Sequence, residues 1–410
     1  MNEASQTNGV VVLCRLDLGK AGSSTSFALT RRNARRQYIK SDSTQQRPCL
    51  SFQDEKCRFG GCRIGKKRHI SRIQMIFWLL IVAVFLAALL LTRLLRLYAL
   101  SRSLMDVPNE RSSHAVPTPR GGGLAIVLSF LAGGLALGGF GLTPWSEVAA
   151  LGGAAAVVAL IGFCDDHGHI PARWRLLVHV AAAAWALAWM GGAPVLPIAG
   201  GVLESGWLGA LLAAVALVWL LNLYNFMDGI DGIAAAEAVC VCSGGAILYL
   251  LTGRPEAGYA PLLLAAAAAG FLCWNFPPAK IFMGDVGSGF LGITLGVLAL
   301  QAGWTAPQLT WSWLILLGTF IVDATWTLLR RLARGERVYE AHRSHAYQRA
   351  SRKAGSHLPI TLAVIGINVL WLFPMAALVA LGYLDGGVAL VIAYAPLLAL
   401  AIGFKAGVHD

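Results

Sequence analysis

Charged residues are scarce in this chain of 410 residues, and the scarcity excludes an ordinary soluble protein. Only 13% of the residues are Asp, Glu, Lys or Arg, whereas a soluble domain has about a quarter. Hydrophobic residues make up 57%, and apolar runs of roughly 17–25 residues recur, which is the length that crosses a bilayer. A soluble fold would leave these runs exposed to water. The composition therefore predicts an all-α, polytopic integral membrane protein.

Acidic residues are fewer than basic ones, but the imbalance does not indicate a nucleic-acid partner, because it is confined to the N-terminal segment. Residues 1–75 contain fifteen Lys or Arg and five Asp or Glu, which accounts for +10 of the net charge of +12. The segment has many Ser, Gln and Arg residues and little apolar periodicity, which is typical of disorder. Because Met75 directly precedes the first apolar run, we interpret residues 1–74 as a basic disordered tail. It is either an extension from a misassigned start or a segment without a role in function, and residues 75–410 form the membrane-embedded domain.

Basic residues are nearly absent from half of the connections between apolar runs. Connections after even-numbered runs contain Arg254 alone, whereas the odd-numbered ones, with the end of the first run and the C-terminal end, contain seventeen Lys or Arg. Cytoplasmic loops carry the excess of Lys and Arg, so we predict a cytoplasmic C-terminus and an N-terminus outside. A tail charged +10 would then lie outside, against the same rule. About eleven transmembrane helices are expected, the eighth short and tilted or broken: Ile76–Leu97, Gly122–Phe140, Val148–Phe163, Leu176–Met190, Trp207–Leu221, Ile233–Leu251, Tyr259–Trp274, Phe290–Ala302, Leu309–Leu329, Ile360–Leu381 and Val388–Phe404.

Aspartates gather in three of the predicted cytoplasmic loops. Carboxylates beside a bilayer are costly and are usually functional when they occur. Such a cluster would repel itself without a cation, and glycines on both sides of the last aspartate would let it approach Mg²⁺ together with phosphate oxygens. The pattern therefore predicts a Mg²⁺ site for a phosphorylated substrate. The five aspartates are Asp165, Asp166, Asp228, Asp231 and Asp285.

Side chains suited to phosphate binding occur in the same loops, so the two sets together predict phosphoryl transfer on one membrane face. Taken singly, each loop is also compatible with an ordinary polar connection. A transporter is the alternative of a different class, although transporters place charges near the midplane, and here only Glu237 and Asp323 lie well within predicted spans. The candidates are Arg111, His114, Arg120, Arg175, Lys280 and the pair His342 and His345, which are three residues apart and so share a helical face.

Five ordered motifs resemble the polyprenyl-phosphate N-acetylhexosamine-1-phosphate transferase superfamily, glycosyltransferase family 4. The resemblance covers residues 76–405 and excludes the tail. Consecutive histidines are typical of the phospho-N-acetylmuramoyl-pentapeptide transferase branch, and the separated histidines here favour the branch that initiates O-antigen-type glycans. The motifs are Arg111-Ser-Ser-His with Pro117-Thr-Pro-Arg-Gly-Gly, Asp165-Asp166, Asn222-x-x-Asn-Phe-Met-Asp-Gly-Ile-Asp-Gly232, Pro278-Ala-Lys-Ile-Phe-Met-Gly-Asp-Val-Gly-Ser288 and His342-Arg-Ser-His-Ala-Tyr-Gln348.

The resemblance implies Mg²⁺-dependent transfer of N-acetylhexosamine-1-phosphate from a UDP-sugar to undecaprenyl phosphate, with release of UMP. It places the enzyme in a bacterial inner membrane, with the active site on the cytoplasmic face, at the start of lipopolysaccharide or other cell-wall glycan synthesis. Mn²⁺ is the alternative metal, and phospho-N-acetylmuramoyl-pentapeptide transfer is the alternative reaction. The sugar and the oligomeric state stay open, a homodimer being one option.

The resemblance also implies roles for individual residues. The implied catalytic residues are Asp165, Asp166, Asp228, Asp285, His342 and His345, with Asp165 acting as base or orienter of the lipid phosphate. The metal is expected on Asp285, with Asp228 and Asn222 as further ligands. The residues expected to bind substrate are Asn222, Asn225, Asp231, Asn275, Lys280, Phe282, Arg111, His114, Arg120 and Arg175.

Overall fold

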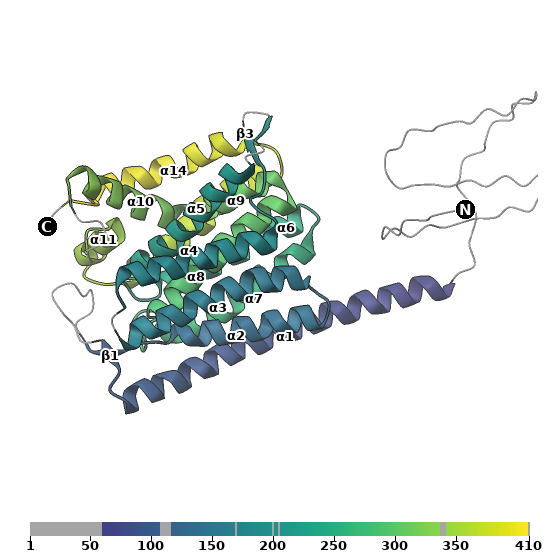
Figure 1. Cartoon of the computed structure of the whole chain (residues 1–410), viewed down its shortest axis with the longest axis horizontal. Helices are drawn as coiled ribbons and strands as arrows, with labels where there is room; N and C mark the ends of the chain where they lie inside the picture. The colour runs from purple at the N-terminus through teal and green to yellow at the C-terminus, as the bar shows by residue number, and fades with distance from the viewer. Residues whose placement is uncertain are drawn as a thin grey trace, which may run out of the picture. The chain divides into compact units, whose positions relative to one another are not determined.

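The computed structural model describes residues 60–106, 116–168, 170–198, 201–203, 206–336 and 342–408 (Figure 1). Two predicted site residues, Arg111 and His114, lie outside the described residues, as do residues 1–59 of the predicted tail. From Gly61 onward the chain forms one compact unit. The fold below is that of this unit.

Each of the eleven predicted spans is helical. The predicted span at 309–329 is divided between two helices that meet at 69°, and the span at 360–381 contains a π-helical turn. The helices are α1 Gly60–Ser101, α2 Gly123–Gly139, α3 Trp145–His167, α4 Ala172–Met190, α5 Gly206–Met227, α6 Ile233–Leu251, α7 Tyr259–Asn275, α8 Asp285–Thr305, α9 Pro307–Leu316, α10 Gly318–Ala333, α11 Ala346–Ala354, α12 Leu358–Ile367, α13 Phe373–Ala380 and α14 Gly386–Gly403, with the 3₁₀ turn η1 Pro255–Gly258 and the π turn η2 Asn368–Leu372.

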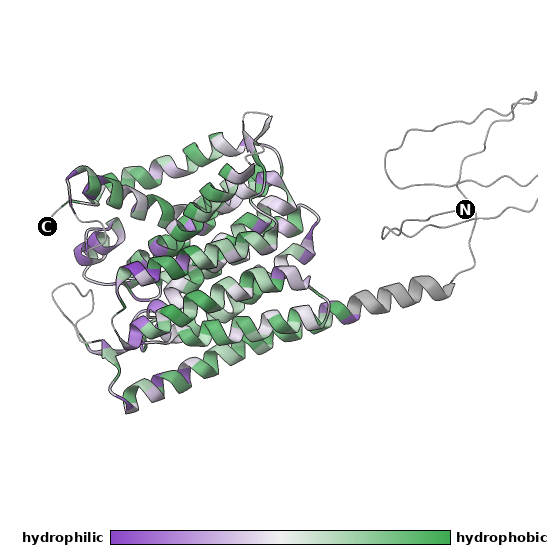
Figure 2. Cartoon of the chain, viewed as in Figure 1, coloured by the Kyte–Doolittle hydropathy of each residue, from purple (hydrophilic) through white to green (hydrophobic). Residues whose placement is uncertain are grey.

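Length and composition allow eight of the described helices to cross a membrane, or nine if α9 and α10 form one bent span. The remaining predicted spans, α2 and α4, are helical but do not meet both criteria. Large apolar side chains such as Leu90, Val215 and Val391 are more than half exposed, which suits a surface in contact with lipid. Figure 2 shows this hydrophobic character along the helices, with hydrophilic residues gathered near their ends. The chain is therefore a polytopic helical membrane protein, and the number and direction of its spans stay predictions.

Helix α8 differs from its prediction, because it is neither short nor broken. It is continuous over 21 residues, and 89% of its most apolar window is buried. Glycines along α8 let α3 and α5 pack closely: a Cβ on Gly292 would lie 2.7 Å from the Leu221 Cα atom. The same glycines lower the hydropathy of the segment, which is why the apolar run seemed short. Helix α8 thus forms the centre of the bundle and carries Asp285 at its first residue.

Two short antiparallel strand pairs complete the described elements. Strand β1 (Met105–Asp106) pairs with β2 (Thr118–Pro119), and β3 (Leu196–Ile198) pairs with β4 (Gly201–Leu203). The β1–β2 pair joins α1 to α2 and is continued by Phe282, whose amide donates to the Pro119 carbonyl at 2.8 Å. This bond brings the loop before α8 beside Arg120, which follows β2.

Candidate active site

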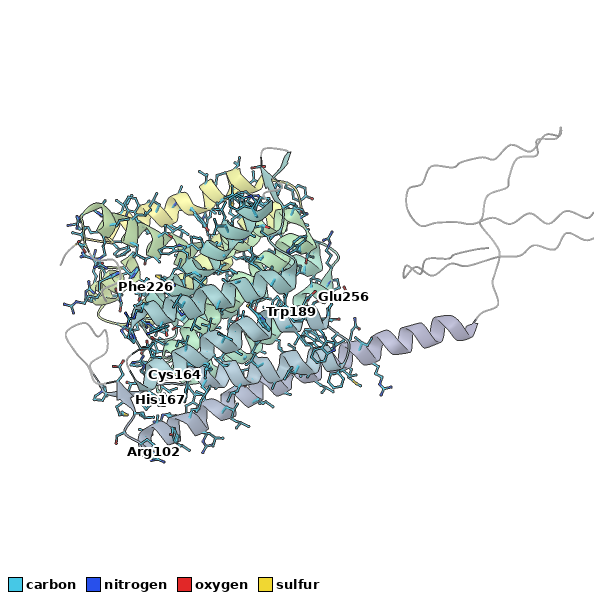
Figure 3. All side chains as sticks on the ribbon, viewed as in Figure 1. Arg102, Cys164, His167, Trp189, Phe226 and Glu256 are labelled. Carbon is cyan, nitrogen blue, oxygen red and sulfur yellow. The ribbon has the colours of Figure 1, made fainter. Side chains whose placement is uncertain are left out.

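The predicted aspartates come from three helix ends that meet at one end of the bundle. Asp165 and Asp166 lie in the last turn of α3, and Asp285 is the first residue of α8. Asp228 directly follows α5. Figure 3 marks this end of the bundle by Cys164, His167 and Phe226. The prediction that these separate loops share one face is therefore reproduced in the fold.

Two arginines connect the carboxylates. The Arg120 Nη2 atom lies 2.5 Å from Asp166 Oδ1 and 3.5 Å from Asp285 Oδ1. Arg175 Nη1 pairs with Asp165 Oδ2 and lies 3.4 Å from Asp285 Oδ2. The side chains of Asp165 and Asp166 are 9% and 4% exposed, whereas that of Asp285 is 27% exposed. Asp285 is thus the most accessible of the three and lies between two guanidinium groups.

Asp166 binds the start of α8 in addition to its ion pair with Arg120. Its carboxylate accepts hydrogen bonds from the Asp285 amide at 3.0 Å and from the Val286 amide at 3.1 Å, so it satisfies amides that the helix itself leaves unpaired. The preceding residue, Gly284, has φ +79°, and a Cβ there would lie 2.6 Å from Asp166 Oδ2. Asp166 therefore orients Asp285, and only glycine fits between them.

A polar cavity of about 280 Å³ opens beside these carboxylates. The Asp228 carboxylate accepts no hydrogen bond from any residue that the structure describes. Burial and, next, the charge of Asp285 raise the pKa of Asp228 well above its usual value. A cation bound in the cavity would therefore stabilise the charged form of these carboxylates. Its lining consists of Asp106, Arg120, Asn225, Asp228, Gly229, Ile230, Asp231, Asn275, Phe282, Met283, Gly284, Asp285, Ser288 and Gln348.

The donor set fits Mg²⁺ bound together with a phosphorylated ligand. Within the described ranges no group of three His, Cys, Asp or Glu side chains forms a complete metal site. Mg²⁺, however, commonly takes one or two carboxylates and completes its shell with water and substrate phosphates. Asp228 and Asp285 offer those two carboxylates. Asn222, the third predicted ligand, does not line the cavity, and its side-chain amide donates to the Val218 carbonyl at 2.7 Å. Asn225, one turn later on α5, does line it and donates to Ser288 Oγ at 2.9 Å.

Three of the predicted substrate-binding residues join neighbouring loops in the cavity wall. Asn275 is 3% exposed, accepts from the Gly232 amide at 3.0 Å and donates to the Ile281 carbonyl at 3.0 Å. Asp231 Oδ2 accepts from the Ala279 amide at 2.9 Å. Phe282 also lines the cavity. These contacts hold the loop after α5 against the loop before α8, so the two loops form one continuous wall of the cavity.

Lys280, by contrast, lies away from the cavity. Its ammonium group stands 5.4 Å from the ring centroid of Trp274, and its carbonyl accepts from Arg96 Nε at 3.1 Å. The residue is absent from the cavity lining. Its direct environment is thus the surface beside α1 and α7.

The two predicted histidines stack on each other behind the cavity wall. Their ring centroids are 4.8 Å apart. His345 is 1% exposed, places Nδ1 3.4 Å from Asp323 Oδ1 and caps α11. Burial and, next, the neighbouring His345 lower the pKa of His342 to about 3, so His342 is neutral at pH 7. Neither histidine lines the cavity, which α11 reaches instead through Gln348.

Comparisons with known proteins show the family of the chain. The family model for glycosyl transferase family 4 matches residues 148–303. A Bacillus subtilis protein named "Probable undecaprenyl-phosphate N-acetylglucosaminyl 1-phosphate transferase" is 30% identical over 300 residues, which cover 72% of this chain and 82% of the relative. The chain belongs to glycosyl transferase family 4.

Two further relatives differ from each other in the transfer reaction that their names describe. A Mycobacterium tuberculosis protein named decaprenyl-phosphate N-acetylglucosaminephosphotransferase is 30% identical over 298 residues, covering 63% of this chain and 71% of the relative. A phospho-N-acetylmuramoyl-pentapeptide-transferase from Moorella thermoacetica is 39% identical over 157 residues, covering 35% of this chain and 49% of the relative. The matched family range contains all five aspartates, while Arg120 and the two histidines lie outside it.

Several residues that build this family 4 site were missed as site residues in the sequence. Asp106, Ser288 and Gln348 line the cavity. Asp323 holds α11 in place by accepting from the Ala346 and Tyr347 amides, both at 2.9 Å. Gln348 and Ser288 stand in the motifs themselves, so their positions were an available clue. Asp323 was visible as an acid within a span, which usually has a partner.

Proposed function

We propose that the protein transfers N-acetylhexosamine-1-phosphate from a UDP-sugar to undecaprenyl phosphate and releases UMP. The observation that carries the proposal is the cavity lined by Asp228, Asp285 and Arg120 at the ends of membrane-type helices, with Arg175 3.4 Å from Asp285. Carboxylates with arginines suit a reaction between two phosphates, because two anions must be brought together. The names of the Bacillus and Mycobacterium relatives support the polyprenyl phosphate and the N-acetylglucosamine phosphate.

Each residue of the site has a role that follows from its contacts. Asp285 and Asp228 would hold Mg²⁺, with Mn²⁺ as the alternative, and the ion would supply Lewis-acid neutralisation of phosphate charge. Arg120 and Arg175 flank Asp285 and would bind phosphate oxygens on either side of it. Asp165, held by Arg175 and by the Ile170 amide at 2.8 Å, would keep the acceptor phosphate in line or take its remaining proton.

A direct displacement suits this arrangement better than a covalent aspartyl-phosphate intermediate. A phosphate monoester has its second pKa near about 6 and is already a nucleophile at neutral pH. A carboxylate nucleophile would add a second transfer and set another anion against the donor. We therefore propose attack of the lipid phosphate on the β-phosphorus of the donor in one ternary complex.

We also propose that the cavity faces the cytoplasm of a bacterium, where the product begins a lipid-linked surface glycan of the O-antigen type. The support is the excess of Lys and Arg in the loops on the cavity side. A UDP-sugar is a cytoplasmic metabolite by its charge, since a diphosphate does not cross a bilayer unaided. The donor would then reach the cavity from water and the acceptor from the membrane.

The test is an assay of the purified full chain in membranes that contain undecaprenyl phosphate. UDP-N-acetylglucosamine, UDP-N-acetylgalactosamine and UDP-N-acetylmuramoyl-pentapeptide are offered in turn with Mg²⁺, and UMP release and lipid mass are measured. We expect a UDP-N-acetylhexosamine to give a lipid diphosphate sugar. Product from the pentapeptide donor alone would replace this proposal by the peptidoglycan reaction. Radiolabel accumulating inside vesicles without a lipid product would replace it by transport.

A further inference from the structure

Segment 404–408, which follows α14, is bound to α10 and α11 through its backbone. Figure 1 shows α10, α11 and the last turns of α14 at one end of the bundle, and the three helices contact one another. Three arginines each donate to one of three successive carbonyls of the segment, and charged donors form stronger hydrogen bonds than neutral ones. The bonds run from Arg330 Nη1 to Ala406 at 3.2 Å, from Arg334 Nη1 to Gly407 at 3.1 Å and from Arg349 Nη2 to Val408 at 2.5 Å.

The backbone of segment 404–408 has an unusual conformation at two residues. Gly407 has φ +72°, and a Cβ there would lie 2.8 Å from the Thr327 carbonyl oxygen. Lys405 has φ +56°, which is uncommon for a residue other than glycine. Such conformations persist only where the surrounding contacts impose them. The segment is therefore held in one defined position against α10.

A small hydrophobic cluster supports segment 404–408 apart from the main core. Ala406 is fully buried and packs with Ala346 at the start of α11 and Ala401 in α14. Trp326 and Phe404 cover this cluster. Because parts of a protein with their own contacts can open separately, release of the segment should leave the main bundle folded.

Segment 404–408 also binds the loop that carries the two histidines. The Gly407 amide donates to the Ser344 carbonyl at 2.8 Å. Ser344 in turn fixes the ring of His342: its amide donates to His342 Nδ1 at 3.4 Å, and its Oγ lies 3.0 Å from the same nitrogen. Because the amide is a donor, Nδ1 accepts and the ring proton lies on Nε2. The segment is thus one residue contact away from the orientation of His342.

The histidine loop continues into the wall of the transferase cavity. The Tyr347 hydroxyl donates to the Phe226 carbonyl at 2.9 Å. A Cβ on Gly229 would lie 3.0 Å from Gln348 Nε2, so the start of α11 packs tightly against the loop after α5. Gln348, Gly229 and the preceding Asp228 all line the cavity. Printed contacts therefore lead without a gap from segment 404–408 to the cavity.

We propose that segment 404–408 positions the loop of residues 342–348 for binding of the UDP-sugar. Gly407 and Arg334 are positioning residues, which act through Ser344 and His342 and do not touch the substrate. The effect falls on the donor, because the loop reaches the cavity through Gln348, whereas the acceptor phosphate is assigned to the side of Asp165. The inference rests on the proposed transferase function.

Two variants of the full chain release the segment, and each has a matched control. Gly407→Ala places a Cβ 2.8 Å from the Thr327 carbonyl, whereas a Cβ in Gly403→Ala meets nothing within 4 Å. Arg334→Ala removes one carbonyl bond without forcing the backbone, so it serves if Gly407→Ala does not fold, and Arg334→Lys restores a donor. Lys353→Ala is the control for lost charge, since Lys353 has no interaction with the described residues.

Initial rates with each substrate varied in turn separate the two KM values from kcat. Gly407→Ala and Arg334→Ala should raise the KM for the UDP-sugar at least about fivefold and keep kcat and the KM for undecaprenyl phosphate within about twofold. Added to His342→Ala, Gly407→Ala should raise the donor KM no further, because residues that act through one another are not additive. Additive effects, an increase confined to the lipid, or KM values equal to those of the controls overturn the proposal.

Hydrogen exchange of the unliganded chain tests the positioning without the reaction. Amides of residues 342–348 should exchange at least about tenfold faster in Gly407→Ala than in Gly403→Ala, while those of α8 stay unchanged. Equal exchange at residues 342–348 overturns the proposal. If exchange rises as expected but the unchanged chain transfers no UDP-sugar, the proposed function has failed, and the assignment to the donor fails with it.

Discussion

At the scale of single residues, the carboxylates of the site have different functions although they look alike in the sequence. The Asp166 side chain is 4% exposed, accepts hydrogen bonds from two amides of α8 and forms an ion pair with Arg120. Asp285 faces the cavity between two arginines. Asp228 lines the same cavity without a donor among the described residues. Asp166 therefore stabilises the start of α8, whereas Asp285 and Asp228 are available to a ligand.

Asp285→Asn should reduce the transferase rate by at least about a thousandfold, the scale of electrostatic stabilisation of a phosphoryl transition state. The change removes the negative charge that faces the cavity while keeping the side-chain volume. UMP release at saturating substrates and a Mg²⁺ titration measure it. Near-normal turnover with an unchanged Mg²⁺ requirement would mean that the ligand lies elsewhere.

Asp228→Asn should stabilise the metal-free protein while it abolishes activity. Burial is the chief cause that raises the folded-state pKa of Asp228. The protein is therefore more stable below the ordinary pKa of about 3.8, where Asp228 is neutral, and it loses this stability as pH rises through the folded-state pKa and the carboxylate becomes charged. Thermal unfolding in chelator should show a higher midpoint for the variant at neutral pH, and the gap should close as pH falls toward 4.

Asp166→Asn is the matched control for that experiment. It removes a carboxylate that accepts hydrogen bonds from two amides and pairs with Arg120, so the thermal unfolding midpoint of this variant should fall. If Asp228→Asn also lowers the midpoint at neutral pH, the Asp228 carboxylate has a stabilising partner, and the interpretation of the cavity as short of a cation fails.

The two histidines should separate into one structural and one functional residue. His345→Ala removes the cap of α11 and the partner of Asp323, so it should lower stability by about 1 kcal/mol, the usual cost of a lost cap. His345→Asn should recover most of that loss, since asparagine caps well. His342 is neutral and its Nε2 has no partner among the described residues, so His342→Ala should chiefly raise the KM for the UDP-sugar.

Unfolding midpoints and separate KM values for the donor and for undecaprenyl phosphate distinguish these effects. An increase confined to the KM for the lipid phosphate in His342→Ala would contradict its assignment to the donor.

At the scale of elements, the sequence predicted all eleven apolar segments as helices but misjudged their continuity. Hydropathy detects runs of large apolar residues, so it found α6 with both ends correct. It shortened α8, where glycine and serine at the start reduce hydropathy but permit close packing. It also joined α9 to α10 across a 69° bend. Bends and helix starts depend on tertiary partners such as Asp166, which a local pattern does not contain.

The motifs predicted which loops meet, but not which atoms within them face the cavity. Lys280 and Asn222 belong to the right segments, yet one stacks on Trp274 and the other bonds its own helix. Spacing fixes the side of a helix on which a residue lies, whereas the loop conformation and the partner contacts fix its direction. Asn225 and Gln348, by contrast, do face the cavity. Asn225 depends on where α5 ends, and Gln348 depends on where α11 begins.

The junction between α3 and α8 should be intolerant of a single added carbon. Gly284→Ala forces a side chain into φ +79° and to within 2.6 Å of Asp166 Oδ2, which should cost about 1–3 kcal/mol of stability and most of the activity. Gly366→Ala in α12 is the control, because a Cβ there meets nothing within 4 Å. Equal unfolding midpoints and turnover for the two variants would show that α8 can begin without this contact.

At the scale of the whole molecule, charge and burial give the bundle two unlike ends. The aspartate end carries Arg120, Arg175 and the stacked pair His342 and His345. The far end carries Glu147 and Glu256 in a cavity without a basic residue in its lining. The same helices, α3 and α8 among them, connect the two ends. The positive-inside rule predicts that the aspartate end faces the cytoplasm.

The N-terminal tail is the one part of the chain at odds with that orientation, because it carries +10 of the +12 net charge. A variant that begins at Met75 should therefore insert in the same direction and keep transferase activity within about twofold. Its first span, residues 76–97, still has the roughly 20 apolar residues that cross a bilayer, and every predicted site residue follows it. The membrane-bound fraction and UMP release test this. Cys164, which precedes Asp165 and is exposed, offers an orientation probe. It should react with an impermeant maleimide in inverted vesicles but not in intact cells. Loss of insertion, or labelling of Cys164 from outside, would show that the tail sets the topology.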